Sequence, residues 1–285
     1  MTRILITGAA GQLGAEFQYL QKWYAHYIFF FKDKKDLDIT NEVSVRKFMK
    51  EKGIEAIVNC AAFTQVDLAE TEIQKASTLN RDAVGNLASV AKEQCIKLVH
   101  ISTDYVFDGV SEHSFKESDK PNPLNVYGKT KWEGEQKMKR VNPLNSIIVR
   151  TSWLYSCFGK NFVSSMLELA KTKKEIAVVS DQVGSPTWAR DLAKMILEIL
   201  PKIENSEVET YHYSNQGKCS WHELARSIFE LKNIPIFVQS IKSKEYPTKA
   251  KRPMYSAMSS AKIQKKFTLE IPSWKDSLAK CLEEL

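Results

Sequence analysis

The first candidates for chemistry are a tyrosine and a lysine in NVYGKTKWEGE, residues 125–135. Tyr127 and Lys131 stand four residues apart in a segment whose composition favours helix, so the phenol and the ammonium share one helix face. Such a pair is usually an ordinary solvated surface. With other functional groups around it, the ammonium would favour the phenolate and lower a pKa that is about 10 in an unperturbed tyrosine. The pair would then exchange a proton with a carbonyl oxygen.

The elements that must position this pair alternate along the first half of the chain. Apolar runs predict strands at 3–7, 26–31, 55–59, 97–102 and 146–150. Helices are expected over 13–24, from the cap at Asn41 to Gly53, over 76–94, and around Tyr127. This alternation predicts an α/β fold with a doubly wound parallel sheet of Rossmann type.

Beyond about residue 155 the alternation weakens, and prolines and aromatic residues occupy irregular segments. We expect a smaller C-terminal substrate lobe there. The predicted division is a dinucleotide-binding domain over 1–154 and a mainly substrate-binding lobe over 155–285, from which some segments return to the first domain.

A glycine-rich turn follows the first strand, in TGAAGQLG with Gly8, Gly11 and Gly14. Such a turn lets backbone N–H groups approach a pyrophosphate at a helix N-terminus, although the spacing differs from the commoner G-x-G-x-x-G. At the end of the second strand Lys32 precedes Asp33. A cation there suits the 2′-phosphate of NADPH, whereas an acid suits the ribose of NADH. The sequence therefore favours NADPH and leaves NADH possible.

The fourth strand ends at Ser102, Thr103 and Asp104. Ligands of a doubly wound sheet bind beyond the carboxyl ends of its strands. Thr103, Tyr127 and Lys131 are therefore expected to converge beside a nicotinamide, with Thr103 bonding a substrate carbonyl and Tyr127 supplying a proton. The chemistry that needs this set is reduction of a ketone by hydride transfer.

Composition limits the other functions. The net charge of +7 is spread along the chain, apart from a loose basic cluster at 241–253, which favours an anionic small molecule over nucleic acid. The longest apolar run, near 28–31, is too short for a membrane span. The five cysteines are scattered, as in a reduced cytoplasmic protein. No clustered carboxylates predict a metal site, and a magnesium requirement is left open.

Three stretches together carry a family resemblance: TGAAGQLG, STDYVFDG and YGKTK. The chain resembles the extended short-chain dehydrogenases/reductases and, among them, the dTDP-4-dehydrorhamnose reductase family. Matching stretches run through nearly the whole length, including RTSWLY at 150–155 and DQVGSPTWARDLA at 181–193. The resemblance implies NAD(P)H-dependent reduction of the C4 ketone of a dTDP-4-keto-6-deoxy sugar, such as dTDP-4-dehydro-L-rhamnose, in a possible homodimer.

The same resemblance implies roles for individual residues. Thr103, Tyr127 and Lys131 would be catalytic. The cofactor would contact Gly8, Gly11, Gln12, Leu13, Asp38, Ile39, Ala61, Ala62, Phe63, Tyr127 and Lys131. The nucleotide sugar would contact Thr103, Asp104, Trp153, Asn161, Gln182 and Arg252.

Two other functions are compatible with the fold. A 4,6-dehydratase or epimerase is one, but dehydratases typically follow the strand-end threonine with Asp-Glu, whereas Asp104 is followed by Tyr105 here. The other is a non-catalytic subunit similar to the regulatory subunit of methionine adenosyltransferase. The intact Thr103, Tyr127 and Lys131 set favours the reductase over both.

Overall fold

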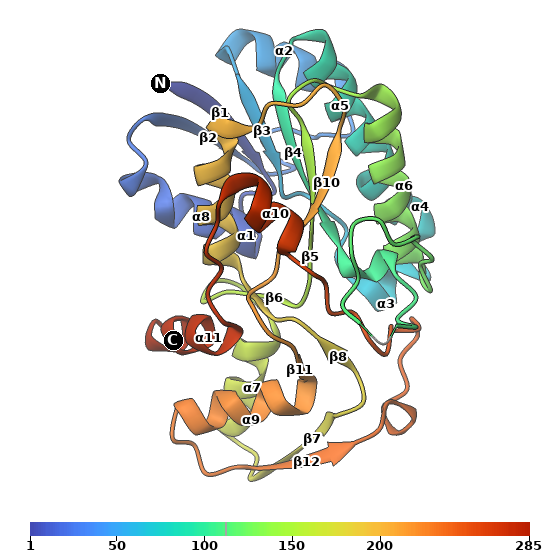
Figure 1. The fold of residues 1–285 in the computed structure, drawn as a ribbon, viewed down its shortest axis with the longest axis vertical. Coiled ribbons are helices and arrows are strands. Elements are labelled where there is room, and N and C mark those ends of the chain that lie inside the picture. Colours follow the sequence, from blue (N-terminus) through green and yellow to red (C-terminus); the bar gives the residue numbers. More distant parts are fainter. Residues whose placement is uncertain (112) are drawn as a thin grey trace.

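A six-stranded parallel sheet organises the larger part of the molecule (Figure 1). The computed structural model describes residues 1–111 and 113–285. The strand order is β10-β5-β4-β3-β1-β2. The strands are β1 (Thr2–Thr7), β2 (Tyr27–Lys32), β3 (Ala56–Asn59), β4 (Lys97–Thr103), β5 (Ile147–Thr151) and β10 (Glu209–His212).

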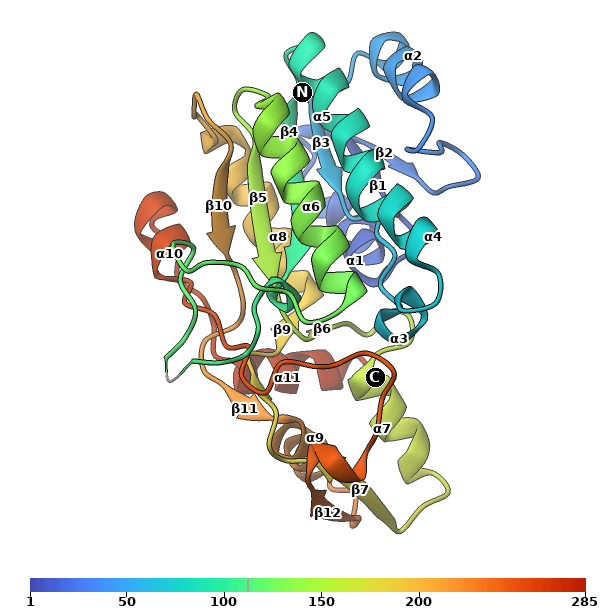
Figure 2. The ribbon, with the colours of Figure 1, turned by 90° about the vertical axis from the view of Figure 1, so that its right-hand side faces the viewer.

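Helices cover both faces of this sheet (Figure 2). Helices α1 (Gln12–Leu20) and α8 (Ala189–Ile199) pack on one face, and α2 (Glu42–Lys52), α5 (Ala83–Glu93) and α6 (Val126–Val141) pack on the other. Each face buries its own apolar core, because the strands are buried on both sides and carry Ile, Val and Leu in continuous runs. The predicted doubly wound Rossmann-type sheet is confirmed.

Local signals set several helix ends. Asn41 caps α2 as predicted, accepting the Ser44 N–H at 3.1 Å, and α2 ends at Gly53 with φ +58°. Asn125 caps α6 in the same way, accepting the Gly128 N–H at 2.8 Å. This cap fixes where the helix of Tyr127 begins.

The helix expected over 76–94 is wrong in its bounds and its continuity. The structure has α4 (Ile73–Ser77), a π-helical turn over Thr78–Asp82, and then α5. The Asn80 side chain in this turn accepts the Phe63 N–H at 2.8 Å and donates to the Phe63 carbonyl at 3.1 Å. These tertiary bonds to the β3 loop accompany the wider turn, and side-chain periodicity does not reveal them.

The helix expected over 13–24 is also shorter than predicted. It ends at Leu20, and a 3₁₀ turn follows over Gln21–Trp23.

A smaller lobe lies below the sheet in Figure 1. Helices α7 (Phe162–Ala170), α9 (Trp221–Leu231) and α11 (Trp274–Glu283) surround its apolar core. Three short strand pairs complete it: β7 (Glu175–Val179) with β12 (Phe237–Ile241), β8 (Val183–Gly184) with β11 (Cys219–Ser220), and β6 (Leu154–Tyr155) with β9 (Thr187–Trp188). The remaining helices are α3 (Val66–Ala69) and α10 (Ala261–Phe267).

Segments after residue 155 also lie on the sheet. Helix α8 packs against α1, and β10 pairs with β5. Strand β6 crosses the predicted boundary between residues 154 and 155, so that division stays a prediction. Within the described ranges, no helix is both long and apolar enough to span a membrane.

Candidate active site

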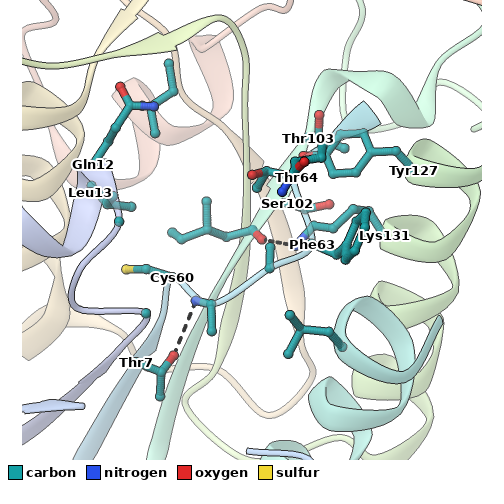
Figure 3. Close-up of a pocket in the computed structure, with 18 of the residues that line it drawn as sticks. Thr7, Gln12, Leu13, Cys60, Phe63, Thr64, Ser102, Thr103, Tyr127 and Lys131 are labelled. Carbon is teal, nitrogen blue, oxygen red and sulfur yellow. Dashed lines mark hydrogen bonds between the residues drawn. The ribbon is translucent and has the colours of Figure 1, made fainter. Parts of the chain in front are cut away.

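A cavity of about 1130 Å³ opens beside the carboxyl ends of β1, β2, β3 and β4 (Figure 3). Residues of the smaller lobe, including Trp221, complete its wall. Most of the residues predicted from the sequence line this one cavity: Gly8, Gly11, Gln12, Leu13, Lys32, Asp38, Ile39, Ala61, Ala62, Phe63, Thr103, Asp104, Tyr127, Lys131 and Trp153. The topology therefore brings together segments far apart in sequence, and the roles of the individual residues stay predictions.

The glycine-rich turn has a geometry that side chains would disrupt. Gly8 has φ +64°, and a Cβ there would lie 2.8 Å from the backbone of Ala61. A Cβ on Gly14 would lie 2.5 Å from the Gly8 oxygen. Helix α1 begins behind this turn with Gly11 at its N-cap and no side-chain cap. The first-turn N–H groups beside the cavity therefore suit an anion, and the turn fits the phosphates of a dinucleotide.

Charged groups mark the end of β2. Lys32 and Asp33 both line the cavity, and the Asp33 Oδ1 atom accepts the Ala10 N–H at 2.8 Å. That carboxylate is engaged in holding the glycine-rich turn. Asp38, farther along the wall, accepts the N–H and hydroxyl of Thr40, and these bonds lower the pKa of Asp38.

The catalytic candidates share one wall of the cavity (Figure 3). Lys131 is 2% exposed, and its Nζ donates to the Ile101 carbonyl at 2.6 Å. Burial lowers the pKa of Lys131 to about 8, against the attraction of Glu135. Lys131 is therefore still mainly an ammonium at neutral pH.

Tyr127 differs from its sequence-based expectation. Burial raises its pKa to about 12, and a hydrogen bond with Thr103 offsets only part of that increase. The expected lowering of this pKa is wrong for the chain by itself, because desolvation of the phenolate and the Asp104 charge both raise the pKa of Tyr127. The phenol is protonated at neutral pH, which is the state that a proton donor to a ketone needs.

Asp104 lies directly beside these groups. Thr103 Oγ1 donates to its Oδ1 at 3.1 Å, and Asp104 is 2% exposed. Burial raises the pKa of Asp104 to about 6, against the hydroxyls of Ser256 and Thr103. Asp104 lines the cavity, and its Oδ2 atom is buried and has no hydrogen-bond partner within the described chain.

Two aromatic residues of the cavity were missed by sequence reasoning. The Tyr105 ring meets the Tyr127 ring edge-on, with centroids 5.6 Å apart. The Trp221 ring stacks on Trp153, with centroids 3.5 Å apart and planes within 5°. Tyr105 follows the STDYVFDG strand end and Trp221 begins SWHELA, so both stood inside stretches that carry the resemblance.

Trp153 itself is tightly constrained. Its φ is +47°, a region that bulky residues rarely adopt, and a Cβ on Gly184 would lie 2.4 Å from its indole. The half-buried indole thus lies between Gly184 and Trp221 of the smaller lobe while it lines the cavity. It serves lobe packing, and its predicted contact with substrate has geometric support.

Three predicted substrate residues do not line the cavity. Asn161 caps α7, accepting the Ser164 N–H at 3.0 Å and donating to the Ser156 carbonyl at 2.7 Å. Gln182 donates to Ser243 Oγ at 3.0 Å. Arg252 forms an ion pair with Asp67 at 2.7 Å. These side chains already have partners within the chain, and their contacts with a ligand stay predictions.

No group of three or more His, Cys, Asp or Glu side chains that could hold a metal ion occurs among residues 1–111 and 113–285. The structure thus offers no protein site from which a magnesium requirement could be argued.

Comparison with known proteins gives the family. The model of the RmlD substrate binding domain matches residues 1–285. The dTDP-4-dehydrorhamnose reductase of Aggregatibacter actinomycetemcomitans is 40% identical over 288 residues, which cover 98% of this chain and 97% of that protein. The chain belongs to the dTDP-4-dehydrorhamnose reductase family. The family predicted from the sequence and the oxidoreductase class are therefore confirmed.

Two further relatives have descriptions that name a cofactor or a substrate. A crystal structure of dTDP-4-dehydrorhamnose reductase from Bacillus anthracis in complex with NADP has a TM-score of 0.94 and 40% identity, with 100% of both chains covered. The dTDP-4-keto-6-deoxy-D-glucose reductase of Streptomyces niveus is 39% identical over 80% of this chain and 78% of its own length. The reductase family thus contains more than one keto-sugar activity.

Proposed function

We propose that this protein uses NADPH to reduce the C4 ketone of a dTDP-4-keto-6-deoxy sugar, converting dTDP-4-dehydro-L-rhamnose to dTDP-L-rhamnose. The observation that carries the proposal is the single cavity that joins the glycine-rich turn to Thr103, Tyr127 and Lys131. The relative from A. actinomycetemcomitans, 40% identical along its length, supports the choice of substrate.

The side chains have distinct parts in this reaction. When bound, the nicotinamide supplies the hydride that adds to C4. Tyr127 transfers its phenolic proton to the carbonyl oxygen, so that the ketone becomes a secondary alcohol. Thr103 holds that oxygen once its hydroxyl proton turns from Asp104 Oδ1 to the substrate, and the Lys131 ammonium stabilises the phenolate left behind. The high pKa of Tyr127 keeps the proton in place until the substrate is bound.

NADPH is favoured over NADH for two reasons. Lys32 lies on the cavity wall at the end of β2, where a 2′-phosphate would need a cation. Asp33, the residue suited to the ribose hydroxyls of NADH, uses its Oδ1 atom to hold the Ala10 N–H. The NADP complex of the B. anthracis relative agrees with this preference.

A second substrate is favoured by one comparison. The S. niveus relative reduces a 4-keto-6-deoxy-D-glucose nucleotide, which differs from the L-rhamnose precursor in its stereochemistry.

A homodimer and a cytoplasmic location stay predictions from the sequence.

The test is a turnover assay with each of the two keto-sugars and NADPH, followed by absorbance of the reduced nicotinamide and by NMR of the product. The proposal expects dTDP-L-rhamnose as the product, with Tyr127→Phe as the inactive control. Faster turnover of the D-glucose derivative would make that keto-sugar the assigned substrate. No turnover of either keto-sugar would refute the proposed function.

A further inference from the structure

A row of buried polar side chains runs below the catalytic wall. Lys131 Nζ lies 3.4 Å from His100 Nε2, and His100 Nδ1 lies 3.0 Å from the Asn59 amide. In the structure the Asn59 NH₂ group is the end that faces His100 Nδ1, and the Asn59 oxygen accepts the Thr7 hydroxyl at 2.6 Å. The row follows the sheet register, since Thr7 pairs with Asn59 on β3, and Asn59 pairs with His100 on β4. His100 and Asn59 are almost fully buried, so water cannot replace their partners.

The donors and acceptors of this row allow only certain arrangements. An ammonium has only donors, so His100 Nε2 must accept from a charged Lys131. Burial and the Lys131 charge hold the pKa of His100 well below its usual value, so the imidazole is neutral. A neutral imidazole that accepts at Nε2 carries its proton on Nδ1.

That Nδ1–H group needs an acceptor, and the Asn59 side chain is the neighbour that can supply one. An amide oxygen and nitrogen exchange places by a half turn, and the hydrogen-bond network decides between the two. With the oxygen toward His100, the Asn59 NH₂ group donates to Thr7 Oγ1, which also accepts the Ala61 N–H at 3.4 Å (Figure 3). This orientation reverses the one in the structure: both ring nitrogens of His100 and both ends of the Asn59 amide then have partners, and the Thr7 hydroxyl gives up its bond to the Asn59 oxygen.

We infer that His100 is a positioning residue for Lys131: as the Nδ1–H tautomer fixed by Asn59, it accepts a hydrogen bond from the ammonium at Nε2 and fixes the place of that charge. The Ile101 carbonyl takes a second N–H of Lys131. The third is left for the cavity that Lys131 lines. The effect of His100 on catalysis rests on the proposed function. The assignment of its proton to Nδ1 does not depend on that function.

A neutral Lys131 would reverse the donors and acceptors along this row. Its lone pair would accept from His100 Nε2–H, and Asn59 would turn its NH₂ group toward Nδ1. The His100 tautomer therefore reports the charge of Lys131. The titratable groups around that charge are Glu135 and Tyr127 on α6, Cys60 after β3, and His100 on β4, and Glu135 is itself paired with Arg150 at 2.7 Å.

The first test is ¹⁵N NMR of the ligand-free protein labelled in its histidine rings, at pH 6.5. The chain has five histidines, and the signals missing from His100→Gln identify those of His100. We expect a protonated Nδ1 and an unprotonated Nε2. A protonated Nε2, whether as the other tautomer or as imidazolium, overturns the inference. The result does not depend on any substrate.

The second test compares two substitutions by turnover. His100→Gln retains a side-chain amide that can accept from Lys131, whereas His100→Leu keeps the volume and removes the acceptor. We expect kcat/KM to fall by about tenfold or more in the Leu variant and to recover in the Gln variant. A folded Leu variant within twofold of the wild type overturns the inference.

Asn59→Leu covers the case in which His100→Leu fails to fold. It removes the Nδ1–H acceptor, and we expect His100 to lose its single tautomer in the ¹⁵N spectrum. An unchanged Nδ1–H tautomer in that variant overturns the role given to Asn59.

Discussion

The cavity has a wall on the side of the sheet and a wall on the side of the smaller lobe. The sequence predicted the lining residues of the first wall better than those of the second. On the sheet side, every residue proposed for cofactor or catalysis lines the cavity. On the side of the smaller lobe, three predicted residues bond to other parts of the chain, namely Asn161, Gln182 and Arg252, whereas the predicted Trp153 lines the cavity. Strand ends are placed by the topology of a parallel sheet, whereas loop residues are placed by local contacts that the topology does not determine.

The largest effect is expected at Tyr127 on the sheet side. Tyr127→Phe removes the proton donor and should lower kcat by about 10²–10⁴-fold, because general acid catalysis contributes about that much. Circular dichroism and the melting temperature should be unchanged, since the ring still meets Tyr105. A Phe variant that reduces the keto-sugar at a near wild-type rate would remove Tyr127 from the catalytic set.

Trp153 tests the wall of the smaller lobe. Trp153→Ala should lower kcat/KM for the keto-sugar. The corresponding loss of transition-state stabilisation should be about 1–3 kcal/mol, because an indole covers the apolar face of a deoxy sugar. Trp221→Ala removes the stacking partner and retains the Trp153 side chain. Because Trp221 also lines the cavity, a larger fall in kcat/KM for Trp153→Ala than for Trp221→Ala assigns the contact to Trp153.

The opposite result for Trp153→Ala would be a stability loss of about 3–5 kcal/mol, typical of a core aromatic, with kcat/KM intact. In that case the residue only packs the two lobes together. Urea unfolding of both variants measures this directly.

Lys32, on the sheet side of the cavity, tests the preference for NADPH over NADH. We expect the wild type to use NADPH at least as well as NADH. Lys32→Ala should lower kcat/KM for NADPH by about tenfold and leave kcat/KM for NADH unaffected, because NADH has no 2′-phosphate for the ammonium to meet. Steady-state kinetics with both cofactors measure the ratio. A tenfold wild-type preference for NADH that the substitution leaves unchanged would contradict this assignment.

Asn161 should show the smallest effect. Asn161→Ala removes the cap of α7 and should cost about 0.5–2 kcal/mol of folding free energy, with kcat/KM unchanged where the variant is folded. Asn161→Ser, which can still cap, should recover most of the stability. A raised KM at unchanged stability would instead make Asn161 a substrate contact.

The sequence predicted features that depend on single residue types or on alternation. The cap at Asn41, the helix end at Gly53 and the five strands of the first half appear in the structure, with strand limits within one or two residues. Their causes are local: an amide that accepts a backbone N–H, a glycine at positive φ, and apolar runs that a covered sheet must bury.

The parts that were missed depend on contacts between distant segments. The π-helical turn at Thr78–Asp82 accompanies the bonds from Asn80 to Phe63, 17 residues earlier. The pKa of Tyr127 follows from burial, which the spacing of a Tyr–Lys pair does not report. The Trp153–Trp221 stack joins the two lobes, and no periodicity connects those positions.

The bond from Ala10 to Asp33 has a consequence for changing the cofactor preference. The same carboxylate lines the cavity at the end of β2, where we expect the ribose, and anchors the glycine-rich turn, where we expect the phosphates, so one residue would serve two ends of the proposed dinucleotide site. Selection for a different cofactor cannot change Asp33 without loosening the phosphate turn. Lys32 and Lys34 also line the cavity, and Lys32 holds the turn only through its backbone carbonyl, which accepts the Ala9 N–H, so we expect the side chains at these two positions to be freer to vary.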